Sequence, residues 1–259
     1  MTAGNDGGAR WGTPLIDSRI AEMDRIEAEL VAADDRNRLF HASYNRTTHA
    51  VRDEIAQARF ADNQWAEMWD VAFADLYLDA LTKWQAAQAL PKPWVIAFEA
   101  SRERLPPLRH VLLGMNAHIN YDLPQALLAV ISDSQFGDPA LLALREADHR
   151  HVDQILAKRV AREEEYLAKD ELAGDRTFID SALTPLNRLG TKRFIKEART
   201  KVWRNALALA GARRAGPKEY ERKLAELETL SERKVAQLLE PGHVLLKLAR
   251  KGFGVVMTP

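Results

Sequence analysis

The sequence predicts an all-α protein: a single multi-helix, bundle-like domain that encloses an internal polar cavity. Three observations support this fold class. Alanine, leucine, glutamate, arginine and lysine dominate the chain, apolar residues recur at helical spacing, and runs of alternating β-branched residues are missing. With 259 residues, 46% of them hydrophobic, the chain can bury a sizeable core.

The first half of the chain predicts four helices. One begins near Asp17 or Ser18, both good N-cap residues, and continues through "RIAEMDRIEAELVAA". A second covers about 36–59, where Phe40, Val51 and Ile55 share one face. A third covers about 63–89, carries a wide tryptophan-rich stripe, and ends at "PKP" (91–93). A shorter helix follows over about 94–104.

Proline, glycine and polar breaks delimit the second half. "PP" (106–107) introduces a helix that contains "GMNAHINYDLP" (114–124), and "SDSQFGDP" (132–139) separates it from a long helix over about 139–170. "ELAGD" (171–175) is a predicted linker, and two or three further helices fill 177–257, broken at "RAGP" and "EPG". We therefore expect a disordered tail over 1–14 and one domain over 15–259, in which the helices of 171–259 pack on a core of 15–170.

Composition excludes several classes of function. Lys+Arg and Asp+Glu are each 37, so no global basic field favours nucleic acid. The chain has no cysteine, so a metal would need His, Asp, Glu or backbone oxygen ligands. We expect a cytoplasmic protein without a signal peptide or a transmembrane segment. Basic stretches at 191–204 and 212–218 predict at most a weak contact with an anionic partner or surface.

Five motifs carry a resemblance to a known family. They are "FHASYNRTTHAV" (40–51), "WDVAFADLYLDAL" (69–81), "PWVIAFEASR" (93–102), "GMNAHINYDLPQAL" (114–127) and "DHRHVDQIL" (148–156). In this order they resemble the domain of unknown function 5995 family, a bacterial all-helical family, over about 15–165. The chain departs from the family at Asp153, where asparagine is more frequent. The resemblance implies the fold and supplies no catalytic residues.

Two histidine–aspartate pairs are the strongest candidates for chemistry. His118 and Asp122 are i and i+4 on one helix, and His149 and Asp153 repeat the spacing on another. Each pair projects from one helix face, so facing helices could supply four ligands to one Zn²⁺, Mn²⁺ or Fe²⁺ ion. Asp70 or Asp79, on the tryptophan-rich helix, is a possible further ligand.

A purely structural interpretation of the first pair is equally open. Asp122 followed by Gln125 matches a capping box, in which the aspartate caps a new helix and Pro124 lies in its first turn. Alternatively, Pro124 interrupts a continuous helix and frees the carbonyl of Asn120 beside the pair.

The remaining candidates are an acid/base group and a pocket lining. Tyr44 lies on the inner stripe of its helix, and His41 lies one turn before it, so either is a candidate proton donor or acceptor. The predicted pocket residues are Asn45, Thr48, Trp69, Met115 and Asn120.

The sequence therefore predicts three possible functions. The first is a metal-dependent enzyme that hydrolyses a phosphoester or similar ester of a small molecule. The second is a metal-free protein that binds or transforms a small apolar ligand in a pocket. The third is a structural or partner-binding helical protein. Phosphate-binding glycine loops, G-x-S-x-G and H-E-x-x-H are absent from the sequence, which disfavours nucleotide-binding folds, serine hydrolases and common zinc proteases.

Overall fold

The computed structural model describes residues 11–169, 184–242 and 244–258, and every regular element in these ranges is helical. This confirms the predicted all-α class. The elements are α1 (Pro14–Ala32), α2 (Arg38–Ala56), α3 (Asn63–Gln85), α4 (Lys92–Glu99), η1 (Ala100–Arg102), α5 (Pro107–Ala117), η2 (His118–Asp122), α6 (Leu123–Val130), α7 (Asp133–Phe136), α8 (Pro139–Lys169), α10 (Thr184–Ala215), α11 (Pro217–Leu239) and α12 (Val244–Lys251).

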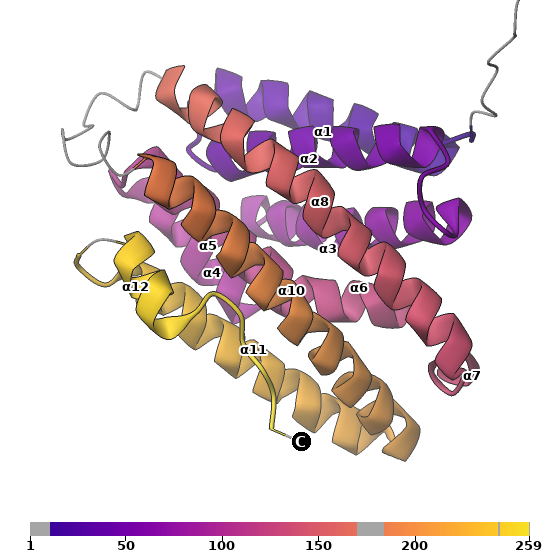
Figure 1. Cartoon of the computed structure of the whole chain (residues 1–259). Coiled ribbons are helices and arrows are strands. Elements are labelled where there is room, and N and C mark those ends of the chain that lie inside the picture. Colours follow the sequence, from indigo (N-terminus) through magenta and orange to yellow (C-terminus); the bar gives the residue numbers. More distant parts are fainter. Residues whose placement is uncertain (1–10, 170–183, 243, 259) are drawn as a thin grey trace, which may run out of the picture.

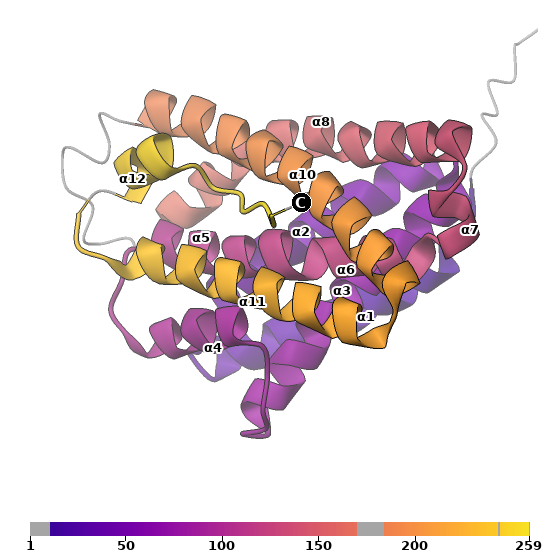
Figure 2. The same cartoon turned by 90° about the horizontal axis from the view of Figure 1, so that it is seen from below.

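The elements α5, η2 and α6 follow one another without a break and form the centre of the molecule. Helices α2, α4 and α11 pack against α5, whereas α3 and α10 pack against α6. On one side, α8, α10, α11 and α4 lie in a row, and α1, α2 and α3 lie on the other side (Figures 1 and 2). Nearly every residue from 110 to 128 is buried, so the polar side chains of this segment need partners within the protein.

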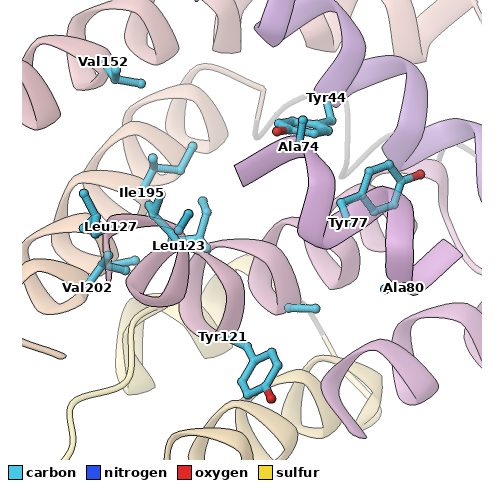
Figure 3. Packing of buried hydrophobic residues seen from close by; sticks show 14 of the residues in the cluster. Tyr44, Ala74, Tyr77, Ala80, Tyr121, Leu123, Leu127, Val152, Ile195 and Val202 are labelled. Carbon is cyan, nitrogen blue, oxygen red and sulfur yellow. The ribbon is translucent and has the colours of Figure 1, made fainter. Parts of the chain in front are cut away.

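Figure 3 shows how the central helix joins two parts of the core. Leu123 and Leu127 face Ile195 and Val202 of α10, while the aromatic side chains of α2 and α3 gather on the other side. All four aliphatic side chains are at most 3% exposed. The α10 helix therefore completes the core of the earlier helices, and its position brings α10 residues next to α3 and α8.

Several helix boundaries differ from the prediction, among them those of α2 (Arg38–Ala56, predicted 36–59) and α4 (Lys92–Glu99, predicted 94–104). Helix α1 begins at Pro14, three residues before Asp17, because proline suits the first helical turn and Thr13 donates its hydroxyl hydrogen to Asp17 (2.8 Å). Helix α3 begins at the predicted residue, where the Asp62 carboxylate accepts the Trp65 N–H (3.0 Å), but it ends at Gln85. Ala87 adopts a positive φ of 53°, which ends the helix before the proline.

Predicted breaks in the C-terminal half agree with the structure where it is described. Gly216 has φ of 130° and, together with Pro217, separates α10 from α11. The predicted linker at 171–175 and the first ten residues of the predicted tail lie outside the described residues. None of the described helices has a stretch long and apolar enough to cross a membrane.

Candidate functional site: a buried polar cluster

The histidine–aspartate motif lies on a π-helical turn. Through residues 118–122 the helix widens, and the Leu123 N–H donates to the His118 carbonyl, five residues back. Pro124 has no N–H to contribute, and the Gln125 side chain donates to the Tyr121 carbonyl (2.8 Å). The wider turn thus accommodates the proline within a continuous helix.

The capping interpretation of Asp122 is wrong. Asp122 has helical backbone angles and its side chain caps no N–H group. A capping box does form ten residues later, between Ser132 and Gln135 at the start of α7. The Asp122 carboxylate instead has side-chain partners within the core.

Asp122 and His118 form a buried hydrogen-bonded pair. The Asp122 Oδ2 atom lies 2.8 Å from His118 Nδ1 and accepts the indole N–H of Trp94 at 2.9 Å. Both side chains are only 3% exposed. Burial raises the pKa of Asp122 and lowers the pKa of His118, while the Trp94 N–H opposes the rise for Asp122. When Nδ1 carries the proton, Nε2 is an unprotonated acceptor that faces away from the carboxylate.

Aromatic rings fix the His118 imidazole from two sides. The Phe73 ring stacks on it, with 3.5 Å between centroids and 4° between planes. The Tyr44 ring approaches it edge-on at 4.5 Å, and Phe40 lies parallel to Tyr44. Because these rings leave the imidazole little rotational freedom, its Nε2 atom has a defined direction.

Five of the buried polar atoms that have no hydrogen-bond partner among the described residues belong to this part of the core. They come from α2, α3, η2 and α8, and they are Tyr44 Oη, Trp69 Nε1, Asp70 Oδ2, His118 Nε2 and His149 Nε2. Each such atom costs about 1–3 kcal/mol when it stays unpaired, so native proteins keep few of them without a functional reason.

Contacts and charges connect the five residues into one cluster. The Tyr44 ring touches the His118 ring, and the charge of Asp70 raises the pKa of Tyr44. Trp69 and His149 form a second contact, with ring centroids 5.4 Å apart, and the Arg199 charge acts on both Asp70 and His149. We refer to these five residues as the polar cluster.

A buried arginine, which the sequence analysis missed, adjoins the polar cluster. The Arg199 guanidinium of α10 donates to the Asp153 carboxylate and to the His149 carbonyl, and it lies 5.7 Å from the Trp69 ring centroid. The arginine lies among buried apolar residues of α10, such as Ile195 and Val202, and this placement is the signal that could have revealed it.

The charge of Arg199 affects two members of the polar cluster. It opposes the burial that raises the pKa of Asp70 to about 7. It also adds to the burial that lowers the pKa of His149 well below its usual value, so His149 is neutral.

Asp70 makes stability depend on pH in a specific window. Its pKa is about 7 in the folded chain against 3.8 for the free side chain, so between about pH 4 and 7 the folded chain keeps a proton that the unfolded chain loses. This contribution to stability is lost as the pH rises through the window. We expect Asp70→Asn to remove this contribution, so the free energy of unfolding, measured with urea, should fall less steeply from pH 4 to 7 in the variant than in the wild type. Equal slopes of the free energy against pH in the two proteins would contradict this.

The structure does not assemble the predicted metal site. In the part of the chain that the structure describes, no group of three or more His, Asp and Glu side chains could hold a metal ion. Asp153 is paired with Arg199, and the side chain of Asp79 is 58% exposed and bonded to Lys83. His118 and Asp122 are bonded to each other. His149 and Asp70 belong to the polar cluster, but they do not form a set of metal ligands with His118 and Asp122.

His41 and Asn45 belong to other parts of the core. His41 Nδ1 lies 2.9 Å from the Tyr77 hydroxyl and its Nε2 lies 2.8 Å from the Met23 carbonyl, so neither ring nitrogen remains for a substrate. The Asn45 amide donates to Asp24 and Glu27 of α1. Tyr44 is therefore the α2 residue that reaches the polar cluster.

The other predicted pocket residues lie around the cluster rather than in it. The Thr48 hydroxyl donates to the Tyr44 carbonyl (3.2 Å), and Met115 is partly buried against the hydrophobic core. Asn120 is fully buried but turns toward the C-terminal segment. Trp69 is a member of the cluster.

Comparison with known proteins identifies the family. A family model described as "Family of unknown function (DUF5995)" matches residues 16–241. The chain belongs to the DUF5995 family. The match extends beyond the five motifs and includes α10 and α11, so Arg199 lies within the DUF5995 region. Searches of curated proteins and of solved structures returned no significant match.

Proposed function

We propose that this DUF5995 protein binds a small, mostly apolar molecule with an oxygen function, such as a hydroxyl, carbonyl or ester, at the polar cluster. In this proposal His118, oriented by Asp122, acts on that molecule as a general base. The observation that supports the proposal is the group of five unpaired, buried polar atoms from four elements. A ligand with its own donors and acceptors would satisfy them.

The His118–Asp122 pair has the arrangement of an oriented base. In this proposal the Asp122 carboxyl is ionised, with the Trp94 N–H supporting its charge, and accepts the Nδ1 proton, which leaves Nε2 to accept a proton from a substrate or from water. Burial keeps the imidazole neutral at neutral pH, because it lowers the pKa of His118. The base is therefore in its unprotonated form before a substrate arrives.

Tyr44 and Asp70 supply complementary hydrogen-bonding groups. Burial and the Asp70 charge raise the pKa of Tyr44, so its hydroxyl stays protonated and can donate to a ligand oxygen. Asp70, with a pKa of about 7, exists both as a donor and as an acceptor near neutral pH. These groups suit a ligand with one or two oxygen atoms, and they provide the acid that complements His118.

The surroundings favour a neutral ligand over a phosphoester. Phe73, Tyr44 and Trp69 present aromatic surface, and the Arg199 guanidinium is already paired with Asp153. A phosphate group would need an unpaired cation or a metal, because burying its charge otherwise costs several kcal/mol. Metal-dependent ester hydrolysis, the first function that the sequence suggests, is therefore the second candidate.

The test compares two buried histidines of the α5–η2 segment. His118→Asn keeps an amide N–H near the former Nδ1 position and removes Nε2, whereas His110→Asn changes a buried histidine eight residues earlier that lies outside the polar cluster. Each full-length protein is purified, its metal content is measured, and its bound small molecules are extracted and identified by mass spectrometry.

We expect the wild type and His110→Asn to retain the same compound and His118→Asn to bind it at least about tenfold more weakly. If the wild type retains no compound, small alcohols, ketones and esters are titrated while the His118 ring resonances are recorded by NMR. No response from any of them would refute the proposal. Stoichiometric metal that is lost in His118→Asn would instead support the hydrolase.

A further inference from the structure

The central helix carries two sets of polar side chains on opposite faces. His118 and Asp122 point toward the polar cluster, whereas Asn116 and Asn120, each two residues from a member of the pair, contact the C-terminal segment. Two residues correspond to about 200° of rotation on a helix, which explains the alternation. Both asparagines are 0% exposed, so their amide groups need partners within the protein.

Asn120 bonds to the backbone of the C-terminal segment with both ends of its amide. Its nitrogen donates to the Phe253 carbonyl (3.1 Å), and its oxygen accepts the Val255 N–H (3.0 Å). Asn116 adds a second donor to the Phe253 carbonyl at 3.0 Å. The residues concerned, 253–258, follow α12 and run back along α10 toward the C-terminus (Figure 2); we call them the C-terminal tail.

A third asparagine, on α10, repeats the arrangement of Asn120 two residues further along the tail. Asn205 donates to the Val255 carbonyl (3.0 Å) and accepts the Met257 N–H (3.0 Å). The two-residue repeat is that of an extended peptide whose backbone groups are paired by side-chain amides. Phe253, Val255 and Met257 are buried, while the intervening Val256 is 46% exposed.

The path of the tail is also sterically specific. A Cβ atom at Gly254 would lie 2.6 Å from the Cα atom of Ala198, so only glycine permits this approach to α10. The Gly254 N–H donates to Glu197, and its carbonyl accepts from Lys201. The groove between η2 and α10 therefore fits one extended backbone in one register.

We propose that this groove is a binding site for an extended peptide, that the C-terminal tail of the same chain is its occupant, and that its docking holds the π-helical turn that positions His118 and Asp122. Asn120 is the positioning residue that links the two. The effect of this link on activity rests on the function proposed above. The effect of the docked tail on the π-helical turn does not.

The physical reason lies in the turn itself. A π-helical turn is a rare conformation that needs local support, and Asn120 stands at its middle residue. Without the tail, the buried Asn120 amide would lose both of its partners in the tail. The turn would then rearrange to expose the amide, and the side chains two residues away on the opposite face would move with it.

The test uses the full chain, with the exposed Val256 changed to cysteine and spin-labelled, which is straightforward because the sequence has no other cysteine. Asn205→Ala removes two bonds to the tail without touching η2, and Val255→Pro removes the N–H that Asn120 accepts. Asn37→Ala, a buried asparagine before α2, is the control. The readouts are label mobility, amide hydrogen exchange of 118–123, and the His118 ring resonances that report its tautomer.

We expect Asn205→Ala and Val255→Pro to mobilise the label, to speed hydrogen exchange at 118–123 by about tenfold, and to shift the His118 resonances. Asn37→Ala should change none of these. A label that stays immobile in both variants overturns the role of the amides. A mobile label with unchanged exchange and unchanged His118 signals overturns the positioning role. None of these readouts requires a ligand at the polar cluster, so they can succeed even if the proposed function fails.

Discussion

Replacement of Arg199 by methionine will lower the free energy of unfolding by about 3–5 kcal/mol, because it leaves buried partners without a donor. The Asp153 carboxylate and the His149 carbonyl both accept from this guanidinium. Asp70 loses the positive charge that opposes the rise in its pKa, so that pKa moves further above about 7. Urea denaturation followed by tryptophan fluorescence measures the first effect, and carboxyl NMR resonances measure the second.

Two further variants separate the buried pair from a general effect of losing an arginine. Arg199→Met/Asp153→Leu removes both charges and should recover much of the lost stability, since an apolar pair of similar volume often replaces a buried ion pair at little cost. Arg222→Met, which breaks an exposed pair with Glu219, should leave the free energy of unfolding nearly unchanged. Equal losses in Arg199→Met and in the double variant would contradict the explanation.

Gly114→Ala is the second substitution for which we expect a large effect. It should lower the free energy of unfolding by about 2–3 kcal/mol. A Cβ atom at this position would lie 2.3 Å from Cγ of Phe40, and the Phe40 ring is itself enclosed by Tyr44, Tyr77 and Trp94. The ring must move, and its displacement will shift Tyr44 against His118. Thermal unfolding and the His118 ring resonances measure the two consequences.

The same substitution at Gly211 provides the control. Gly211 lies inside α10 and a Cβ atom there meets nothing within 4 Å. Alanine is favoured over glycine in a helix by about 0.5–1 kcal/mol, so Gly211→Ala should raise the free energy of unfolding. If Gly114→Ala and Gly211→Ala changed the free energy of unfolding in the same direction, the close approach of Phe40 would not limit the residue at position 114.

The order of the helices follows from local features of the sequence. Apolar spacing predicted the long helices, and the predicted starts at 63 and 139 agree with those of α3 and α8. The start of α1 was predicted late because Asp17 and Ser18 are good N-caps in isolation, whereas Pro14 in fact begins the helix. The π-helical turn could not be predicted, because no local pattern in the sequence specifies it and its side chains bond to residues far away in the chain.

The candidate site was predictable only in part. The i, i+4 spacing correctly placed His118 and Asp122 on one face, but it could not show whether they bind a third atom or each other. Arg199 was not recognised, because it lies in the basic stretch 191–204, which resembles a solvated face, and its apolar neighbours on α10 are the one local sign of burial. Its role depends on Asp153 and His149, about fifty residues away in the chain.

The sequence by itself determined that this chain is all-helical, where most helices lie, and which side chains share a helix face, because helical periodicity is a local property. The tertiary structure alone decided which of those faces meet. It paired Asp122 with Trp94, turned Asn120 toward the C-terminal tail, and gathered unpaired polar atoms from four elements. These outcomes depend on packing and on the cost of burying unpaired polar groups, and both involve residues far apart in the chain.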